Sequence, residues 1–348
     1  AREPVRFRWP WKKWCDEQTM NASDDRGTIE QALWRMMVLI RVVEERIGEL
    51  VSTGDIHTPC HLSIGQEAIP AGVCAALQPD DSLWGGHRSH GQYLAKGGDL
   101  RAMMAEIFGK ATGCARGRGG SMHLVDPAQG IFGTVPLVAA TIPLAVGAGL
   151  SAKLRGTQQV AVAFFGDGAT DEGHFHESLT LAALYQLPVL FVCENNLYST
   201  HLTLKERRVK DNIVESADLH GLSGERVDGN DVMAVQSAAQ QAVQRARAGN
   251  GPTLLECRTY RWRGHVGPAA DLEVGEDRRR ELDEWRQRDP IARCRERLRA
   301  QGLSSERFES LEAAVRDEVE EAVSFARQSP APDDSELLHH VYVSRRGV

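Results

Sequence analysis

The run Val160-Ala-Val-Ala-Phe-Phe165 is continuously apolar and ends at Gly166-Asp167-Gly168. A second apolar run, Leu187-Pro-Val-Leu-Phe-Val-Cys193, ends at Glu194-Asn195-Asn196, and residues 174–185 between the two runs carry an amphipathic helical pattern. A strand, a helix and a strand in this order are typical of a βαβ unit in a parallel sheet that is covered on both faces. This stretch predicts an α/β fold built on a doubly wound parallel sheet.

A second unit of the same kind follows. We expect a short strand leading into Val227-Asp228-Gly229, a helix over residues 231–248 and another strand over residues 253–260. The residues Asn250-Gly251-Pro252 favour a turn before that last strand. The parallel sheet is therefore expected to continue beyond the first unit.

The first half of the chain predicts helices and loops. Residues 27–53 carry apolar side chains at helical spacing, with Thr28 as the expected N-cap and Gly54 directly after the helix. Residues 59–149 are rich in glycine, histidine and small side chains. We expect short helices and binding loops there, with few strands.

From about Asp271 the chain is charged and helix-forming. One helix is expected to reach Arg286, a second to begin at Asp289-Pro290, and a third to span residues 305–327. We expect these helices to be additions to a single domain. The chain is accordingly divided into an N-terminal arm (1–26), a domain (27–335) and a tail (336–348).

The composition excludes several classes of function. The 348 residues carry a formal net charge of −7, and the arginines are interleaved with glutamates, so we expect no nucleic-acid partner. Seven scattered cysteines with no Cys-x-x-Cys pair are typical of free thiols in a reducing compartment. No apolar run approaches the roughly 18 residues of a membrane span, and the tryptophan-rich start lacks the apolar core of a signal peptide. We expect a cytoplasmic protein without a membrane contact.

Asp167 and Asn196 come at the ends of the two apolar runs. Because the carboxyl ends of parallel strands share one edge of a sheet, one helical crossover would bring these two oxygen-bearing side chains together. A carboxylate, an amide carbonyl and phosphate oxygens suit Mg²⁺. Gly166 and Gly168 would let a diphosphate approach the backbone, and the following helix would direct its positive N-terminus at that anion. The sequence therefore predicts a magnesium-diphosphate site.

Other phosphate and metal motifs do not fit. The segment Gly166 to Asp171 lacks the third glycine of the dinucleotide fingerprint. Gly109-Lys110 is followed by Ala111, where a P-loop requires Ser or Thr. His87-x-x-His90 has no further metal ligands at a matching spacing.

The chain resembles the alpha subunit of the decarboxylating, first component of 2-oxo acid dehydrogenase complexes, especially of the pyruvate and acetoin branches. Gly-Asp-Gly followed by Glu-Asn-Asn is similar to the thiamine diphosphate motif of that family. The resemblance runs from about Ile29 to Glu336 and implies thiamine diphosphate and Mg²⁺ as cofactors. It includes further motifs in one order: His61-Leu-Ser-Ile-Gly-Gln-Glu67, His87-Arg-Ser-His-Gly91, Gly119-Gly-Ser-Met-His123, Pro136 to Gly149, and Gly264-His265.

The resemblance implies a role for each matching residue. Asp167, Asn196 and the backbone carbonyl of Tyr198 would ligate Mg²⁺. The amides of Gly168 and Ala169 would contact the diphosphate, and Arg88 would pair with it as a charged donor. These assignments agree with the donor types that the strand-end argument requires.

The same resemblance implies how the rest of the cofactor is held. Pro136 and Val138 match backbone positions that bind the aminopyrimidine. His61 and His265 match the catalytic histidines that reach toward the cofactor and the substrate carboxylate, and His87 takes a cofactor-binding position where many relatives carry a tyrosine. Histidines also make chemical sense in such a crevice, because they transfer protons near neutral pH.

The resemblance also implies partners. A thiamine enzyme needs an acid, normally a glutamate, from a pyrimidine-binding domain, and the sequence shows no second domain of that kind. The family supplies it on a beta subunit, in a tetramer of two alpha and two beta chains. The acyl group from a small 2-oxo acid, pyruvate by default, would pass to a lipoyl carrier on an acyltransferase core.

Three functions stay open at this point. The first is the dehydrogenase component that passes an acyl group to a lipoyl carrier. The second is a thiamine-dependent carboligase or ketol-transfer subunit of a biosynthetic pathway, and the third is a non-catalytic binding subunit. The presence of both Asp167 and Asn196 counts against the third. The sequence does not identify the 2-oxo acid, the partner chain, or the roles of His87 and the tryptophan-rich arm.

Overall fold

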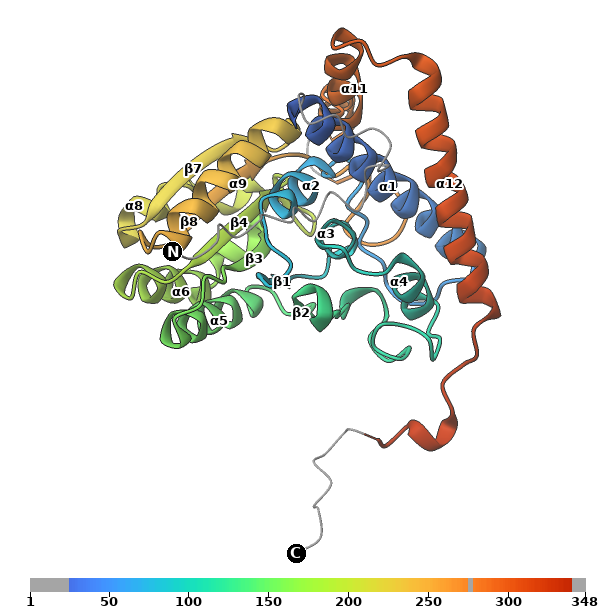
Figure 1. Ribbon diagram of the computed structural model, residues 1–348, viewed down its shortest axis with the longest axis horizontal. Helices are drawn as coiled ribbons and strands as arrows, with labels where there is room; N and C mark the ends of the chain where they lie inside the picture. The colour runs from blue at the N-terminus through green and yellow to red at the C-terminus, as the bar shows by residue number, and fades with distance from the viewer. Residues whose placement is uncertain (1–24, 275–277, 340–348) are drawn as a thin grey trace, which may run out of the picture.

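The computed structural model describes residues 25–274 and 278–339 (Figure 1). Its centre is a six-stranded parallel sheet with the strand order β2-β1-β3-β4-β8-β7. The strands are β1 (Ser82–Gly85), β2 (Ile131–Thr134), β3 (Ala161–Gly166), β4 (Val189–Asn195), β7 (Ser223–Asp228) and β8 (Thr253–Arg258). A two-stranded antiparallel hairpin, β5 (Tyr198–Ser199) and β6 (Leu202–Thr203), lies beyond β4.

The sheet is buried on both faces. Along β3, Val162 and Phe164 belong to one apolar core, whereas Ala163 and Phe165 belong to the other. This alternation follows from the two-residue period of a strand, whose successive side chains point to opposite faces. It explains why the central runs are continuously apolar, and it confirms the prediction of a parallel sheet covered on both sides.

Helices from different parts of the chain cover each face (Figure 1). The larger core contains side chains from α1 (Asp25–Thr53), α2 (Ala68–Ala75), α3 (His90–Lys96), α4 (Leu100–Ile107), α9 (Val232–Arg247), α11 (Pro290–Ala300) and α12 (Ser305–Gln328). The smaller core contains side chains from α5 (Thr141–Arg155), α6 (Gly173–Leu184), α7 (Leu204–Arg207) and α8 (Ser216–His220). The architecture is thus doubly wound, as predicted.

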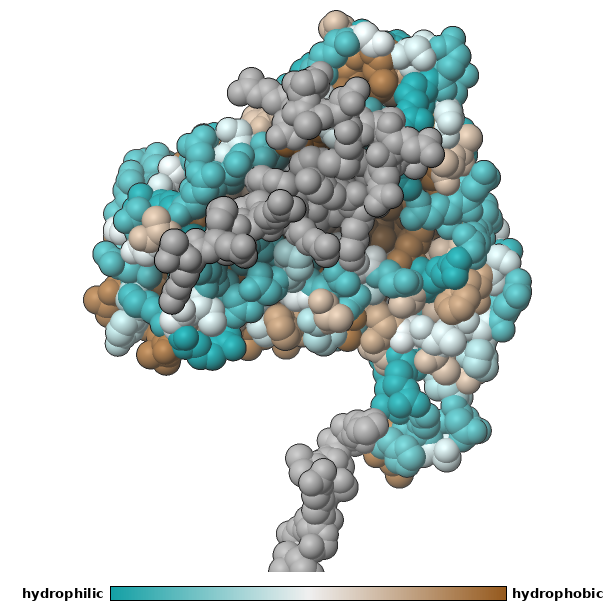
Figure 2. Space-filling model, in the orientation of Figure 1, coloured by the Kyte–Doolittle hydropathy of each residue, from teal (hydrophilic) through white to brown (hydrophobic). Residues whose placement is uncertain are grey.

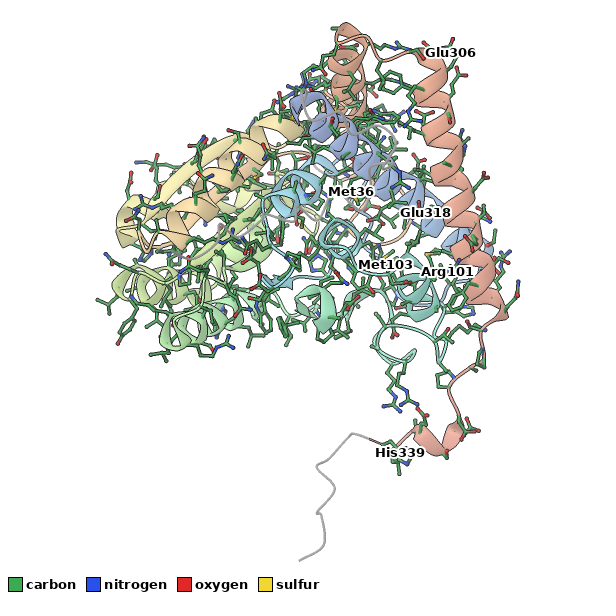
Figure 3. All side chains as sticks on the ribbon, viewed as in Figure 1. Met36, Arg101, Met103, Glu306, Glu318 and His339 are labelled. Atoms are coloured by element: carbon green, nitrogen blue, oxygen red, sulfur yellow. The ribbon has the colours of Figure 1, made fainter. Side chains whose placement is uncertain are left out.

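The charged C-terminal helices are confirmed as additions to this fold. The helix α10 (Arg278–Arg286) is followed by α11 and α12, close to the predicted bounds. The long helix α12 runs beside α1 at the edge of the molecule, and Figure 3 labels Glu318 on its inner side. Nη2 of Arg35 on α1 lies 2.7 Å from Oε2 of Glu318, so ion pairs as well as apolar contacts join the two ends of the chain.

Some sequence predictions were wrong or incomplete. The helix α1 begins at Asp25, so Thr28 lies in its first turn and is not its N-cap. The strands β1 and β2 lie in the segment expected to have few strands, and each has only four residues, too few to show a period. The predicted arm, residues 1–26, lies outside the described residues apart from the start of α1, as do the last residues of the tail. Within the described part of the chain, no helix is long and apolar enough to span a membrane.

Candidate active site

A pocket of about 200 Å³ lies where β1, β3, β4 and β8 end. Its lining comes from strand ends and from loops that cross the carboxyl edge of the sheet, which is where α/β folds bind ligands. All of the predicted site residues line it: His61, His87, Arg88, Pro136, Val138, Asp167, Gly168, Ala169, Asn196, Tyr198 and His265. The structure therefore brings together residues as far apart in the sequence as His61 and His265.

Asp167 and Asn196 project from neighbouring strands. Gly166 of β3 pairs with Glu194 of β4, so Asp167 lies one residue beyond this pair and Asn196 two residues beyond it. The Asp167 side chain is 1% exposed; Oδ2 binds Arg207, whereas Oδ1 has no hydrogen-bond partner among the described residues. Burial raises the pKa of Asp167, and the charge of Arg207 opposes this rise. A buried carboxylate oxygen without a partner is a position for a cation.

Three contacts fix the loop that carries Asn196. Its Nδ2 donates to Oε1 of Gln66 at 3.0 Å, and its Oδ1 accepts from the backbone N–H of Tyr198 at 3.3 Å. The preceding Asn195 points away from the pocket and donates to Oε1 of Glu256 at 2.8 Å. Leu197 has a φ of 72°, which turns the chain sharply after the strand. Of the two asparagines, only Asn196 lines the pocket.

Tyr198 is anchored by the C-terminal helix α10. Its hydroxyl donates to Oε2 of Glu281 at 2.7 Å, and the hydroxyl of Tyr260 donates to the same oxygen at 2.9 Å. The guanidinium of Arg278 lies 5.0 Å from the centre of the Tyr198 ring, in a cation–π contact. The charged helix α10 therefore holds the pocket wall in place.

Gly166 and Gly168, on either side of Asp167, are glycines for different structural reasons. A β-carbon at Gly166 would meet nothing within 4 Å, which leaves the backbone open to a ligand. A β-carbon at Gly168 would lie 2.4 Å from Oγ of Ser199, so the protein's own packing already requires glycine there. Gly168 and Ala169 belong to the short 3₁₀-helix η5 (Asp167–Asp171), whereas α6 begins only at Gly173. The amides nearest the pocket are thus those of η5, not those of the expected longer helix.

Three histidines form a cluster at the opposite wall. The rings of His61, His87 and His265 offer nitrogen atoms that all lie within 4.8 Å of one another. Burial, together with the nearby charge of Arg88, lowers their pKa values to about 2 for His61, about 3 for His87 and about 4 for His265. All three rings are therefore neutral at physiological pH.

Two arginines border this cluster. Arg88 donates to the backbone carbonyls of Leu62 and His265, and a nitrogen of Arg261 lies 3.4 Å from Nδ1 of His265. Burial lowers the pKa of Arg88 to about 10 and that of Arg261 to about 9, so both remain charged near neutral pH. Two guanidinium groups beside three neutral imidazoles favour an anion over a divalent cation.

Arg261, Gln66, Gln92 and Glu194 line the pocket but were not predicted as site residues. Arg261 follows the strand β8 by three residues, so the strand-end argument could have found it. Glu194 is buried and accepts from Gln92 at 2.8 Å; burial raises its pKa to about 8, although the charge of Arg88 opposes this. Gln66 stands inside the motif from His61 to Glu67 but had no role assigned to it, and Gln92 lies just outside the motif from His87 to Gly91.

His90, which the sequence analysis rejected as part of a metal motif, is structural. Its ring nitrogens contact Oε2 of Glu44 at 2.9 Å and Oγ of Ser121 at 2.8 Å, and all three side chains are fully buried. This arrangement has the order of a Ser-His-Glu triad, but none of the three residues lines the pocket. It therefore ties α1, α3 and the 3₁₀-helix η3 (Gly120–Met122) together.

A doubly wound parallel sheet with a polar, histidine-rich pocket at its carboxyl edge defines an α/β enzyme of the cofactor-binding class. The family model of the dehydrogenase E1 component matches residues 35–335, and the chain belongs to this family. Membership implies the use of thiamine diphosphate.

Known relatives narrow this further. The alpha subunit of acetoin:2,6-dichlorophenolindophenol oxidoreductase of Bacillus subtilis (strain 168) is 44% identical over 91% of this chain and 95% of its own length. The pyruvate dehydrogenase E1 component subunit alpha-3, chloroplastic, of Arabidopsis thaliana is 40% identical over 95% of this chain and 79% of its own length. The pyruvate dehydrogenase E1 component subunit alpha of Rhizobium meliloti (strain 1021) is 38% identical over 87% of this chain and 87% of its own length. The chain is thus an alpha subunit of a 2-oxo acid dehydrogenase component, an oxidoreductase, as the motifs implied.

Proposed function

We propose that this alpha subunit decarboxylates a small 2-oxo acid at a site that holds thiamine diphosphate through Mg²⁺ and that is completed by a beta subunit. Pyruvate is the first candidate substrate, because two of the relatives above are named for pyruvate. The relative from Bacillus subtilis is named for acetoin. Acetoin and pyruvate share a two-carbon acetyl unit, whereas only pyruvate has a carboxylate. The acyl acceptor is proposed to be a lipoyl carrier.

The observation that carries the proposal is the buried Oδ1 of Asp167 beside Asn196, for which the described part of the chain offers no hydrogen-bond partner. A carboxylate oxygen, an amide carbonyl and the backbone carbonyl of Tyr198 are hard oxygen donors of the kind that Mg²⁺ binds. Diphosphate oxygens would complete its coordination. The residues present therefore fit a magnesium-diphosphate group.

The remaining pocket residues fit the rest of the cofactor. The amides of Gly168 and Ala169 and the guanidinium of Arg88 are donors for the diphosphate. Pro136 and Val138 lie on the loop between β2 and α5 and would contact the aminopyrimidine through their backbone. His87 would face the same ligand as a neutral imidazole.

When bound, thiamine diphosphate supplies the electron sink that decarboxylation of a 2-oxo acid requires. The chain's own residues position the substrate and move protons. Arg261 is a fixed charge for the substrate carboxylate beside His265. His61 has a buried Nδ1 with no hydrogen-bond partner among the described residues, so this nitrogen is available for a hydrogen bond with the substrate or the cofactor.

A beta subunit would cover the exposed apolar side chains next to the pocket. Leu137 and Val138 line the pocket and are 69% and 54% exposed, so ligand and partner would meet at the same rim. Figure 2 shows hydrophobic side chains at the outer edge formed by α5 and α6, where Leu154 and Leu184 are largely exposed. Exposed apolar side chains that gather on one face are typical of an interface. Two alpha and two beta chains, and a cytoplasmic location, are part of this proposal.

The carboligase alternative is not favoured, because the relatives above are named as dehydrogenases and oxidoreductases. The test uses the alpha chain with and without its beta partner, pyruvate, thiamine diphosphate, Mg²⁺ and a purified lipoyl domain. We expect acylation of the lipoyl domain by the assembled enzyme and little turnover by the alpha chain alone. Full turnover by the alpha chain alone, or acyloin formation without lipoyl acylation, would contradict the proposal.

A further inference from the structure

Gln66 lies inside the pocket but has none of the roles proposed above. Its side chain is 1% exposed, and its Oε1 accepts a hydrogen bond from Nδ2 of Asn196 at 3.0 Å. The other end of the same amide, Nε2, has no hydrogen-bond partner within residues 25–274 and 278–339. Because an unmade hydrogen bond of a buried donor is destabilising, this N–H₂ group points to a ligand oxygen.

The backbone that carries Gln66 is fixed by its surroundings. Gly65 has a φ of 96°, and a β-carbon there would lie 2.5 Å from Cδ1 of Trp262. Oγ1 of Thr259, just past β8, donates to the carbonyl of Gly65 at 3.2 Å, and the N–H of Gln66 donates to Ser63 at 2.9 Å. The free amide end is therefore presented from a rigid turn, not from a mobile loop.

The contact with Asn196 selects one orientation of the asparagine amide. If that amide were turned over, Oδ1 of Asn196 would face Oε1 of Gln66, and two acceptors would be in contact. In the observed orientation Oδ1 accepts from the backbone of Tyr198 at 3.3 Å and keeps a second lone pair for a cation. Outer contacts of this kind orient metal ligands in many proteins.

We propose that Gln66 is a binding and positioning residue of this site. Its Oε1 holds the Asn196 amide with the carbonyl oxygen toward the cation, and its Nε2 donates to a ligand oxygen that the same cation binds. That oxygen belongs to a diphosphate, with a cation-bound water as the other source of the same chemistry. This inference rests on the proposed function, because it assigns Gln66 to the proposed magnesium-diphosphate site.

The test uses the full alpha chain assembled with its beta partner, and Mn²⁺ as a paramagnetic probe. Free Mn²⁺ is measured by electron paramagnetic resonance, with and without inorganic pyrophosphate. Gln66→Leu removes both ends of the amide, and we expect the Mn²⁺ affinity to fall roughly 10- to 100-fold in both conditions. Gln66→Glu keeps an acceptor for Asn196 but loses the donor, so Mn²⁺ alone should bind at least as well, while the gain in affinity from pyrophosphate should be lost.

A matched control is Gln236→Met, which removes another buried glutamine, on α9, whose Nε2 donates to Gln240 at 3.2 Å. It should bind Mn²⁺ like the wild type. Circular dichroism and the unfolding midpoint show whether each variant is folded. If Gln66→Leu does not fold, Gln66→Glu decides the donor role by itself.

The outcomes separate this inference from the proposed function. If the wild type binds Mn²⁺ and a folded Gln66→Leu variant binds it equally well, the positioning role is wrong. If Gln66→Glu keeps the full effect of pyrophosphate, the donor role to a diphosphate is wrong. If Gln66→Leu nevertheless weakens Mn²⁺ binding, the ligand oxygen belongs to a cation-bound water. If the wild type binds no Mn²⁺ in either condition, the proposed metal site itself is wrong.

Discussion

The guanidinium of Arg207 binds the carboxylate of Asp167 directly, and Asp167 is the charged side chain among the donors of the proposed metal site. Its second nitrogen binds Asp171, so Arg207 on α7 bridges both acidic residues of η5. A cation that binds Asp167 must compete with this guanidinium. The position of α7 is therefore coupled to the state of the metal site.

The first prediction follows from this competition. Arg207→Gln removes the competing charge from Asp167, so the Mg²⁺ affinity in the presence of thiamine diphosphate should rise by roughly three- to tenfold. Titration calorimetry of the assembled enzyme measures it. Arg208→Gln is the matched control, because Arg208 contacts Asp171 at 3.0 Å and Thr170 at 2.7 Å but not Asp167. An equal rise in both variants would show that the affinity responds to the loss of a positive charge near the pocket and not to the contact with Asp167.

The second prediction concerns Asp167 itself. Asp167→Ala removes a carboxylate that would ligate the cation directly, so magnesium-dependent cofactor binding should be lost. The loss should exceed the roughly 10- to 100-fold change that an outer contact causes. Asp171→Ala removes the neighbouring carboxylate, which does not line the pocket, and should change the affinity far less. Unchanged affinity of Asp167→Ala in calorimetry would refute the assignment of this site.

Asp167 and Asn196 show which part of the candidate site could be predicted from the sequence. The continuous apolar runs before them identify buried parallel strands, and the parallel arrangement alone brings their carboxyl ends to one edge. The C-terminal helices were also predictable, because Asp289-Pro290 and the spacing of apolar residues mark their limits. Local rules and one topological rule were sufficient for these parts.

Local sequence patterns do not predict the positions of Gln66 and Arg207 or the strands β1 and β2. Arg207 meets Asp167 only because the β5–β6 hairpin returns α7 across the end of the sheet. Gln66 reaches Asn196 only because its turn is packed against Trp262 after β8. The strand β1, with four residues, is a strand because its neighbours β2 and β3 complete its hydrogen bonds. Each of these depends on contacts between distant segments, which no single window of sequence contains.

The third prediction tests the proposed partner surface. Leu154→Asp places a charge on the exposed face of α5, where Leu154 is 79% exposed, and it should weaken assembly with the beta subunit without unfolding the alpha chain. Leu338→Asp is the matched control, because Leu338 is 80% exposed and lies near the end of the sequence, far from α5 along the chain. Analytical ultracentrifugation of mixed alpha and beta chains measures both. Equal assembly of the two variants would exclude α5 from the interface.

The last prediction is a pH dependence of stability that originates in the histidine cluster. Burial first, and then the charges around it, lower the pKa of His61 to about 2 in the folded protein, whereas a histidine in an unfolded chain titrates near 6.5. Between these values the unfolded chain binds more protons than the folded protein. The stabilising contribution of the neutral His61 ring to the free energy of unfolding should therefore be complete above about pH 6.5. It should decrease as the pH is lowered toward 4.

His61→Gln removes one of these titrating groups. The slope of the unfolding free energy against pH, measured by urea denaturation between pH 5 and 6.5, should fall by up to about 1.4 kcal/mol per pH unit. His174→Gln, on the exposed start of α6, should leave the slope unchanged, because water surrounds that ring before and after unfolding. A slope for His61→Gln equal to that of the wild type would mean that the His61 ring takes up its proton without unfolding. The pKa of His61 would then lie near its ordinary value of about 6.5 in the folded protein as well, and burial would not hold it down.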